Sequence, residues 1–484
     1  MAIKKKLGTH NKGLILFLVA AAQFMVVLDI SIVNVALPSI FRDLSFSSTS
    51  NLQWVITAYT LVFGGFLLFG GRLADLYGRK KVFLGGVLAF TIASLLCGLA
   101  QDSGQLVIAR ILQGTSAAIM SPAALSIVVT TFKEGKERNR ALGVWAAVAA
   151  GGAAVGVLMG GILTQYLDWR WNFFVNIPVG LLVLVLARTN VPESKADLGH
   201  KQLDLWGALL STSGLMLLVY ALAKAPELGW TDGTSLTYFS LSFLILYAFI
   251  KNEQNVKNPL MPLSIFKIRN VSAANLVQLP VAASLFSMFF FLTLYLQSTL
   301  GFSPVKTGFA FLPVTIVIGI ASGVVSSLLT KIGFKIPLSV GPLFLAIGLL
   351  LFSQMGVGGH YLSDVLPGLI IMSMGLGIVF VSITIAATNG VPHDDSGLAS
   401  GILNTSQQIG GALGLAVLSG VAASSTTSYL ASNPNDILGA QVAGSHDAFL
   451  VGMTFAITAL VLALLFVKQQ KGEKIDPKSA MLGG

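Results

Sequence analysis

The sequence predicts an all-α polytopic membrane protein with fourteen transmembrane helices grouped as six, two and six. Three observations predict it: the composition, the alternation of basic loops along the chain, and an internal repeat. Hydrophobic residues make up 54% of the 484 residues and charged residues only 10%, and the mean hydropathy is +0.81. A water-soluble domain needs far more charge to cover its surface, so most of this chain must face lipid or other helices.

Apolar runs bounded by charge, proline, glycine or polar clusters define the predicted spans, since a helix needs about 20 apolar residues to cross a bilayer. The first run is too long for the core of a signal peptide and lacks a cleavage end, so we expect it to be retained. The predicted spans are residues 13–37, 52–70, 82–99, 105–130, 141–163, 173–187, 205–222, 236–250, 271–296, 305–329, 336–355, 365–387, 397–423 and 448–467.

Basic residues gather in every second loop between these spans. Cytoplasmic loops of membrane proteins are enriched in Lys and Arg. The opposite loops carry only Arg42, Arg170, Lys224 and Lys306. We therefore expect a multi-pass protein of the cell (inner or plasma) membrane with both termini in the cytoplasm. The net charge of +10 then reflects topology and not nucleic-acid binding. The basic clusters lie within residues 4–12, 72–81, 133–140, 188–201, 251–269, 331–335 and 468–478.

The chain also repeats itself at nearly one offset. Leu73, Gly78, Lys80 and Gly86 recur 255 residues later, and Gly143, Gly152 and Gly156 recur 258 residues later. Such a repeat predicts two pseudo-symmetric six-helix bundles around a midplane site, which is the architecture of a transporter. The predicted parts are the N-terminal bundle 1–190, a two-helix insertion with cytoplasmic linkers 191–262, the C-terminal bundle 263–470 and a cytoplasmic tail 471–484.

Asp29 lies inside the first apolar run, where a carboxylate is costly and normally marks an ion or substrate path. It is nine residues from Pro38 at the outer end of that span, or about 13 Å. Arg110 is six residues from Gly104 in the fourth span, or about 9 Å. The similar depth predicts that the two charges meet. One interpretation is that the pair only holds two helices in register. The other, which we favour, is that Asp29 gains and loses a proton, because its ionised form is stabilised when Arg110 is beside it and destabilised when Arg110 is diverted.

The segment Gly71–Lys81 reads GRLADLYGRKK and forms a tight basic loop. Asp75 sits where a span ends and can pair with Arg79 or cap a neighbouring helix, which would make a charged latch. The alternative is a loop that only fixes topology. The predicted latch residues are Gly71, Asp75, Gly78, Arg79 and Lys80.

This loop resembles the signature motif of the major facilitator superfamily, and LVIARILQGTSAA resembles the superfamily's fourth-span motif through Arg110, Gln113 and Gly114. LDISIVNVALP resembles the first-span motif of the fourteen-span drug:proton antiporters. WRWNFFVNIPVG and GLASGILNTSQQIGGALG are typical of the same multidrug efflux family. The resemblance covers nearly the whole chain. It implies the major facilitator fold, in which the first and fourth spans line a central cavity.

One motif departs from the family pattern. The fifth-span antiporter motif appears as GAAVGVLMGG, with Val157 where the resemblance implies proline. Small residues allow close helix contact, whereas a proline would promote bending. How the fifth helix flexes during antiport, and whether the glycines do more than pack, both stay open. The motif glycines are Gly152, Gly156, Gly160 and Gly161.

Polar and aromatic side chains within the spans are candidates to contact a substrate. Any single polar group is more often a helix-to-helix hydrogen bond than a ligand contact. Two of the aromatic candidates can share one helical face. No cluster with metal-ligand spacing is visible, no cofactor beyond a proton gradient is expected, and Cys97 is read as a small packing residue. The cavity candidates are Asn34, Tyr59, Gln113, Asn176, Gln278, Phe286, Phe290, Asn404 and Gln407.

The resemblance implies a proton-coupled secondary active transporter that exports amphipathic small molecules or drugs by alternating access. We expect neutral or monocationic substrates, because Asp29 is the one deep carboxylate visible in the sequence. The alternatives are a lipid or metabolite exporter, or an uncoupled facilitator, of the same fold. A receptor would need a soluble domain, and an enzyme would need a catalytic set that the spans lack. The expected partners are the substrate, protons and the lipid bilayer, with a monomer as the functional unit.

Overall fold

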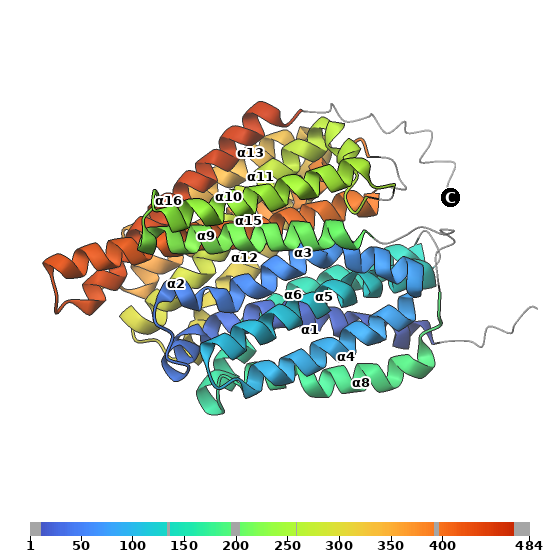
Figure 1. Ribbon diagram of the computed structural model, residues 1–484, viewed down its shortest axis with the longest axis horizontal. Coiled ribbons are helices and arrows are strands. Elements are labelled where there is room, and N and C mark those ends of the chain that lie inside the picture. Colours follow the sequence, from blue (N-terminus) through green and yellow to red (C-terminus); the bar gives the residue numbers. More distant parts are fainter. Residues whose placement is uncertain (1–10, 133–135, 195–203, 258, 392–395, 469–484) are drawn as a thin grey trace, which may run out of the picture. The chain divides into compact units, whose positions relative to one another are not determined.

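The computed structural model describes residues 11–132, 136–194, 204–257, 259–391 and 396–468, and within them the chain is helical with no strand (Figure 1). Thirteen helices in the described residues are long and apolar enough to cross a bilayer, and α6 brings the number to fourteen. The predicted all-α, fourteen-helix fold class is confirmed. The predicted tail 471–484 lies outside the described residues.

The first half of the chain contains α1 (Lys12–Asp43), α2 (Thr49–Leu52), α3 (Trp54–Tyr77), α4 (Arg79–Leu99), α5 (Ser103–Thr131), α6 (Lys136–Tyr166), α7 (Trp171–Phe174), α8 (Asn176–Asn190), α9 (Leu205–Leu228) and α10 (Gly233–Asn255). The second half contains η1 (Leu263–Lys267), α11 (Arg269–Leu294), η2 (Tyr295–Thr299), α12 (Pro304–Ile332), α13 (Lys335–Ser353), η3 (Tyr361–Val365), α14 (Leu366–Thr388), α15 (Ser396–Ser432) and α16 (Ile437–Phe466).

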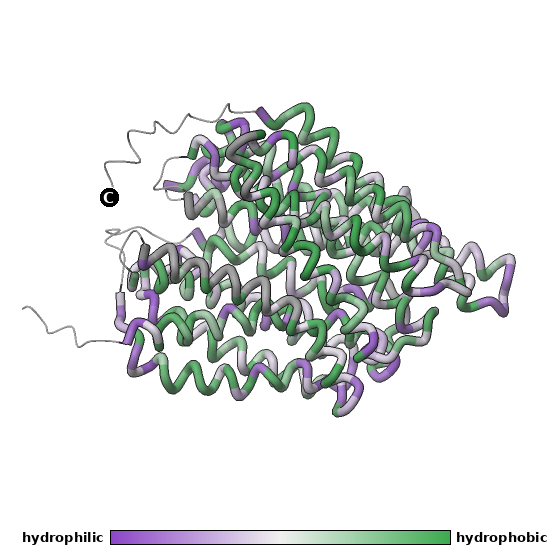
Figure 2. Tube along the Cα trace, turned by 180° about the vertical axis from the view of Figure 1, so that it is seen from behind, coloured by the Kyte–Doolittle hydropathy of each residue, from purple (hydrophilic) through white to green (hydrophobic). Residues whose placement is uncertain are grey.

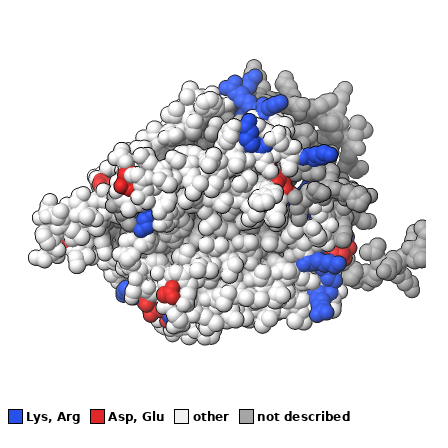
Figure 3. Space-filling model, in the orientation of Figure 1, with Lys and Arg blue, Asp and Glu red and all other residues white. Residues whose placement is uncertain are grey.

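Polar residues mark where the helices begin. The side chains of Asn11, Asp102, Asp204, Asp232 and Asp436 each accept a hydrogen bond from a backbone N–H in the first turn of the next helix. These caps satisfy donors that have no partner inside the helix. Most of the helical trace is apolar and the strongly polar residues gather mainly toward the helix ends (Figure 2), and the helix surfaces in view in Figure 3 carry few charges. This is the distribution that lipid requires.

The described chain forms two compact units. One contains residues 1–262, 289–312 and 415–424, and the other contains residues 263–288, 313–414 and 425–484. In the first unit α3 packs on α5, α1 on α6, and α4 on both α5 and α8. In the second unit α13 packs on α14 and α16. The domain boundaries expected from the sequence stay predictions.

The glycine repeat corresponds to a repeated helix pairing, observed separately in each unit. In the first unit, a Cβ added to Gly156 of α6 would lie 3.0 Å from the Leu28 carbonyl oxygen of α1. In the second, a Cβ added to Gly410 of α15 would lie 2.3 Å from the Leu279 carbonyl oxygen of α11. Only glycine lets these backbones approach so closely. Gly78 and Gly333, which also repeat, both have positive φ, 109° and 69°.

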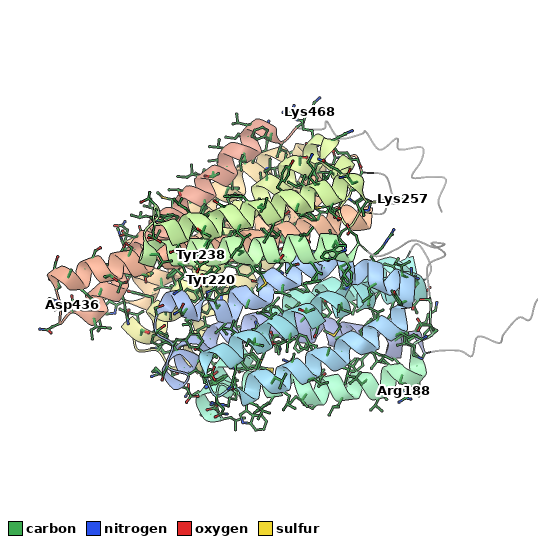
Figure 4. The ribbon with its side chains drawn as sticks, in the orientation of Figure 1. Arg188, Tyr220, Tyr238, Lys257, Asp436 and Lys468 are labelled. Carbon is green, nitrogen blue, oxygen red and sulfur yellow. The ribbon has the colours of Figure 1, made fainter. Side chains whose placement is uncertain are left out.

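The two-helix insertion is attached to the first unit through α3. Helix α9 packs on α3 and α10 packs on α9. A Cβ added to Gly65 of α3 would lie 2.4 Å from Thr212 Oγ1 of α9, so a glycine notch receives that side chain. At the other end of the contact, Trp54 and Tyr220 place their ring centroids 6.3 Å apart, and Tyr220 lies 5.3 Å from Tyr238 of α10 (Figure 4).

Most helices run a few residues beyond the predicted spans, and the largest differences are at three places. The sixth span is broken into α7 and α8 at Val175, whose backbone N–H bonds to the Trp171 carbonyl. Helices α15 and α16 run further than expected, to Ser432 and from Ile437, and Asp436 caps the turn between them (Figure 4). The added turns are rich in serine, threonine and other polar residues. A span predicted from hydropathy stops where such residues begin, although the helix continues.

Candidate functional site

Asp29 is completely buried in the middle of α1, with 0% of its surface exposed. Its Oδ2 forms an ion pair with Nη1 of Arg110 from α5, which is 1% exposed. Its Oδ1 accepts hydrogen bonds from Nε2 of Gln113, at 2.7 Å, and from Nδ2 of Asn176, at 3.4 Å. The structure thus brings together Asp29 and Arg110, as the sequence predicted, and adds two amide donors. The carboxylate faces the interior of the first unit and not lipid.

Arg110 has partners besides Asp29. Its Nε donates to the Val55 carbonyl oxygen at 2.7 Å, and its Nη1 donates to Gln113 Oε1 at 2.6 Å. The guanidinium carbon lies 4.3 Å from the ring centroid of Tyr59 and 5.7 Å from that of Phe173. A buried cation is tolerated when hydrogen bonds and aromatic faces surround it. The guanidinium therefore keeps hydrogen-bond and ring partners that do not depend on the charge of Asp29.

Gln113 links the ion pair to α4. Its Nε2 also donates to Ser94 Oγ at 2.9 Å, and the Sγ of Cys97 lies 3.4 Å from its Oε1. Sequence reasoning did not select Ser94 and treated Cys97 only as packing. The spacing of Ser94 and Cys97 could have pointed to both, because residues three positions apart on a helix share a face. Together, α1, α3, α4, α5, α7 and α8 surround one carboxylate with a continuous network.

The motif glycines of α6 hold this helix against α1 beside Asp29. A Cβ on Gly152 would lie 3.3 Å from Phe24, and one on Gly160 would lie 2.6 Å from the Ile32 carbonyl oxygen. Gly161 faces the beginning of α12 within the same unit, with its Cβ position 2.5 Å from the Pro304 carbonyl oxygen. Around Val157 the helix runs unbroken, as expected without a proline.

The predicted latch loop is tied down by Glu193, a residue that sequence reasoning missed. Its carboxylate accepts the backbone N–H of Lys80 at 3.1 Å and of Lys81 at 3.2 Å, and so caps the beginning of α4. The Arg79 N–H donates to the Ser194 carbonyl at 2.9 Å. The side chain of Asp75 lies outside the part of the structure that is described. The role of the loop stays a prediction.

The other cavity candidates do not join the Asp29 network. Asn34 bonds back to the Ile30 carbonyl of its own helix at 2.8 Å. Phe286 packs against Gly411, and Phe290 is fully buried with its ring centroid 5.1 Å from that of Phe291. Gln278, Asn404 and Gln407 belong to the second unit, where Gln278 is buried and Asn404 is exposed. The structure describes no group of three His, Cys, Asp or Glu residues that could hold a metal ion.

Comparisons with known proteins agree with this fold. A family model described as Major Facilitator Superfamily matches residues 19–415. The puromycin resistance protein pur8 of Streptomyces alboniger is 43% identical over 450 residues, which are 92% of this chain and 89% of that protein. The cephamycin export protein CmcT of Amycolatopsis lactamdurans is 40% identical over 417 residues, 85% of each chain.

Among solved structures, a bacterial homologue of the human lysosomal transporter Spinster, in an inward-facing and occupied conformation, superposes with a TM-score of 0.70. The match covers 96% of this chain and 98% of that chain at 15% identity, which shows the fold alone. The family match spans most of the sequence, and relatives of 40% identity and more share most of its length. The chain therefore belongs to the major facilitator superfamily and is a multi-pass membrane transporter.

Proposed function

We propose that this transporter exports a small amphipathic organic compound in exchange for protons, with Asp29 as the proton carrier. The observation that carries the proposal is the fully buried carboxylate on α1 held by a fully buried arginine. Ionisable residues inside a membrane span are costly to bury, and where they occur they normally mark an ion or substrate path. Relatives named for puromycin resistance and cephamycin export support an antibiotic-like substrate.

The neighbours of Arg110 support a change of charge at Asp29. When Asp29 takes up a proton, the guanidinium loses its counter-ion, and an uncompensated buried charge costs about 3–5 kcal/mol. The Val55 carbonyl, the Gln113 amide oxygen and the Tyr59 ring remain beside the cation and offset part of that cost. The site therefore has two accessible states, one neutral overall and one carrying a single positive charge.

This difference in charge couples the proton to the substrate. A monocationic substrate binds the neutral pair better than the protonated, positively charged site, so proton and substrate compete. A ligand shifts a conformational equilibrium only through its different affinity for the two states. Asp29 takes up a proton when the site faces outward and loses it when the site faces inward and binds substrate. The inward proton gradient then drives export through alternating access of the two bundles.

We assign supporting roles to the other motif residues. The loop Gly71–Lys81 closes the cytoplasmic side, and its capping by Glu193 fixes the beginning of α4 for that purpose. Gln278, Phe286, Phe290, Asn404 and Gln407 contribute to the substrate cavity. The protein works as a monomer in the cell membrane with both termini in the cytoplasm.

The test uses purified protein in proteoliposomes with an imposed pH gradient and radiolabelled puromycin as the probe. We expect wild-type protein to accumulate puromycin only with the gradient. Asp29→Asn should lose this accumulation and should also slow the exchange of puromycin between the two sides at equal pH, because the amide mimics the protonated acid, leaves the site positively charged and cannot release a proton. Asp232→Asn, which changes an exposed acid that caps α10, serves as the matched control and should behave as wild type.

Two outcomes would contradict the proposal. If Asp29→Asn transports at the wild-type, gradient-dependent rate, Asp29 is not the proton carrier. If wild-type protein moves puromycin down its concentration gradient at a rate independent of the pH gradient, the chain is an uncoupled facilitator of the same fold.

A further inference from the structure

A second pair of buried carboxylates lies in the two-helix insertion, away from the Asp29 network. Asp204, the residue that caps α9, is 7% exposed, and Glu253, near the end of α10, is 4% exposed. A Cβ added to Gly207 would lie 2.4 Å from Asp204 Oδ2 and 2.6 Å from Glu253 Oε1. The two oxygens therefore face one point, and the two side chains lie within hydrogen-bonding reach of each other.

The hydrogen bonds around this pair leave one oxygen without a donor. Asp204 Oδ1 accepts from the Gly207 N–H at 2.8 Å, and both its carboxylate oxygens accept from Nδ2 of Asn252, at 2.9 and 2.8 Å. Glu253 Oε2 accepts from the Met261 N–H at 2.8 Å. Among the described residues, no donor reaches Glu253 Oε1. A buried acceptor beside another carboxylate oxygen needs a hydrogen, and an ionised pair has none to give.

No described cation neutralises the pair. On α10, Lys251 places its Nζ 5.5 Å from the ring centroid of Tyr247, and Lys257 is exposed beyond the helix end. The neighbouring helix α3 carries Arg72. The ion pairs that the structure describes include no contact of these side chains with Asp204 or Glu253. Two negative charges this close in a buried place are unstable, and such pairs share a proton.

We propose that Asp204 and Glu253 bind one proton between them, carried on Glu253 Oε1 and donated to Asp204 Oδ2. The protonated pair, called the clasp below, then holds the Met261 backbone N–H in a pH-dependent way. The hydrogen-bond donors decide which group is protonated, because Asp204 already accepts from Gly207 and Asn252 and so favours the ionised form. Glu253 joins α9 through Oε1 and the segment after α10 through Oε2. This second proton site is independent of Asp29 and of the transport proposed above.

The clasp responds to pH in one direction. Loss of the shared proton places two negative charges together, so Glu253 moves away and releases the Met261 N–H. The closed clasp binds one proton more than the open one, so it is strongest in acid. As the pH rises, its opening constant increases by up to about tenfold per pH unit until the closed pair has lost its proton.

Hydrogen–deuterium exchange of the Met261 amide in full-length protein, followed by mass spectrometry from acid to mildly alkaline pH, tests the proposal. After correction for intrinsic exchange, the wild-type opening constant should rise with pH by up to about tenfold per unit. Glu253→Gln should give a low, pH-independent constant, because its amide donates permanently to Asp204 and its oxygen still accepts from Met261. Asp204→Asn should also remove the pH dependence, because its amide can donate to ionised Glu253.

The control is Asp232→Asn, which alters the equivalent cap of α10 in an exposed position and should follow the wild-type curve. A pH-independent opening constant in wild-type protein overturns the proposal. So does a wild-type pH curve in either Glu253→Gln or Asp204→Asn, and the use of two variants keeps the test decisive if one of them fails to fold.

Discussion

Arg110 donates from Nε and Nη1 to three acceptors, which requires the fixed fork of a guanidinium. We expect Arg110→Ala to lower the free energy of unfolding by about 3–5 kcal/mol, because it leaves Asp29 buried without a counter-ion. Combining it with Asp29→Asn should restore much of the loss. Denaturant unfolding of both single variants and the double variant measures the coupling. Strictly additive effects would show that the pair contributes nothing as a pair.

Gln113 gives a second prediction at the scale of one side chain. Gln113→Leu keeps a similar size but removes the hydrogen bonds to Asp29, Arg110 and Ser94. We expect a loss of about 1–3 kcal/mol of stability, because buried partners are left unsatisfied. Gradient-driven transport should fall as well. Gln441→Leu, at an exposed position of α16, is the control and should change stability little; an equal effect of both variants would contradict this reading.

Depth along a helix was enough to predict that Asp29 meets Arg110, because 1.5 Å per residue fixes height in the membrane. It was not enough to say which of the polar candidates join them. Gln113, Asn176 and Tyr59 do so, while Asn34 bonds to its own helix. The difference depends on the rotation of each helix about its axis, which side-chain packing sets. The Val55 carbonyl could not be foreseen at all, because a backbone group has no sequence signature.

At the scale of elements, Gly78 ends α3 and allows α4 to begin. Its φ is 109°, and an added Cβ would lie 2.7 Å from Glu193 Oε1. We expect Gly78→Ala to cost about 1–2 kcal/mol of stability through backbone strain and to disturb the cap on α4. Gly71→Ala in the same motif should be nearly neutral, since its Cβ would meet Pro122 at an ordinary 3.6 Å. Thermal unfolding of both variants makes the comparison, and equal melting temperatures would refute it.

The contact between α6 and α1 gives another prediction. A Cβ on Gly160 would lie 2.6 Å from the Ile32 carbonyl oxygen, so Gly160→Ala must push the two helices apart. We expect reduced stability and reduced transport, because α1 carries Asp29. Gly85→Ala on α4, where an added Cβ meets nothing within 4 Å, should be neutral or stabilise by about 0.5–1 kcal/mol. If Gly160→Ala unfolds at the same temperature as wild type, α6 does not hold α1 as described.

Helix number and order could be read from hydropathy, whereas helix ends could not. The extensions of α15 and α16 carry Ser425, Thr426, His446 and Asp447, which resemble a loop when only apolar residues are counted. These side chains satisfy one another and the backbone: Ser425 Oγ donates to Asp447 Oδ2 at 2.5 Å, and Thr426 Oγ1 donates to the Ala440 carbonyl at 3.2 Å. Contacts between two helices, invisible in one window of sequence, continue the hairpin.

For the molecule as a whole, the charge pattern predicts which loops face the cytoplasm. Cys97 is the single cysteine of the sequence, so a Cys97→Ser background offers no competing thiol. In intact cells, a membrane-impermeant maleimide should label Asn435→Cys between α15 and α16 but not Lys257→Cys after α10, and the latter should react once the membrane is opened. Both positions are exposed. Labelling of Lys257→Cys in intact cells would invert or break the predicted topology.

The fold was predictable at this scale because composition, alternating basic loops and the repeat all report the same architecture. The repeated glycines lie at the contacts of α6 with α1 and of α15 with α11, but the repeat did not say which helices would pair there. What the sequence could not supply is the position of the insertion. Its contact with α3 includes the glycine notch that receives Thr212 and the rings of Trp54 and Tyr220, and neither a single Gly65 in a glycine-rich chain nor two separate aromatic residues form a recognisable pattern.

That attachment has a practical consequence. The turn between α9 and α10, around Gly229 and Trp230, is exposed and takes no part in the Asp29 network. A rigid fiducial protein fused into this turn would be carried by the first unit as a fixed marker. In electron micrographs, such a fusion would supply a feature for orienting the particles without altering any residue proposed to handle protons or substrate.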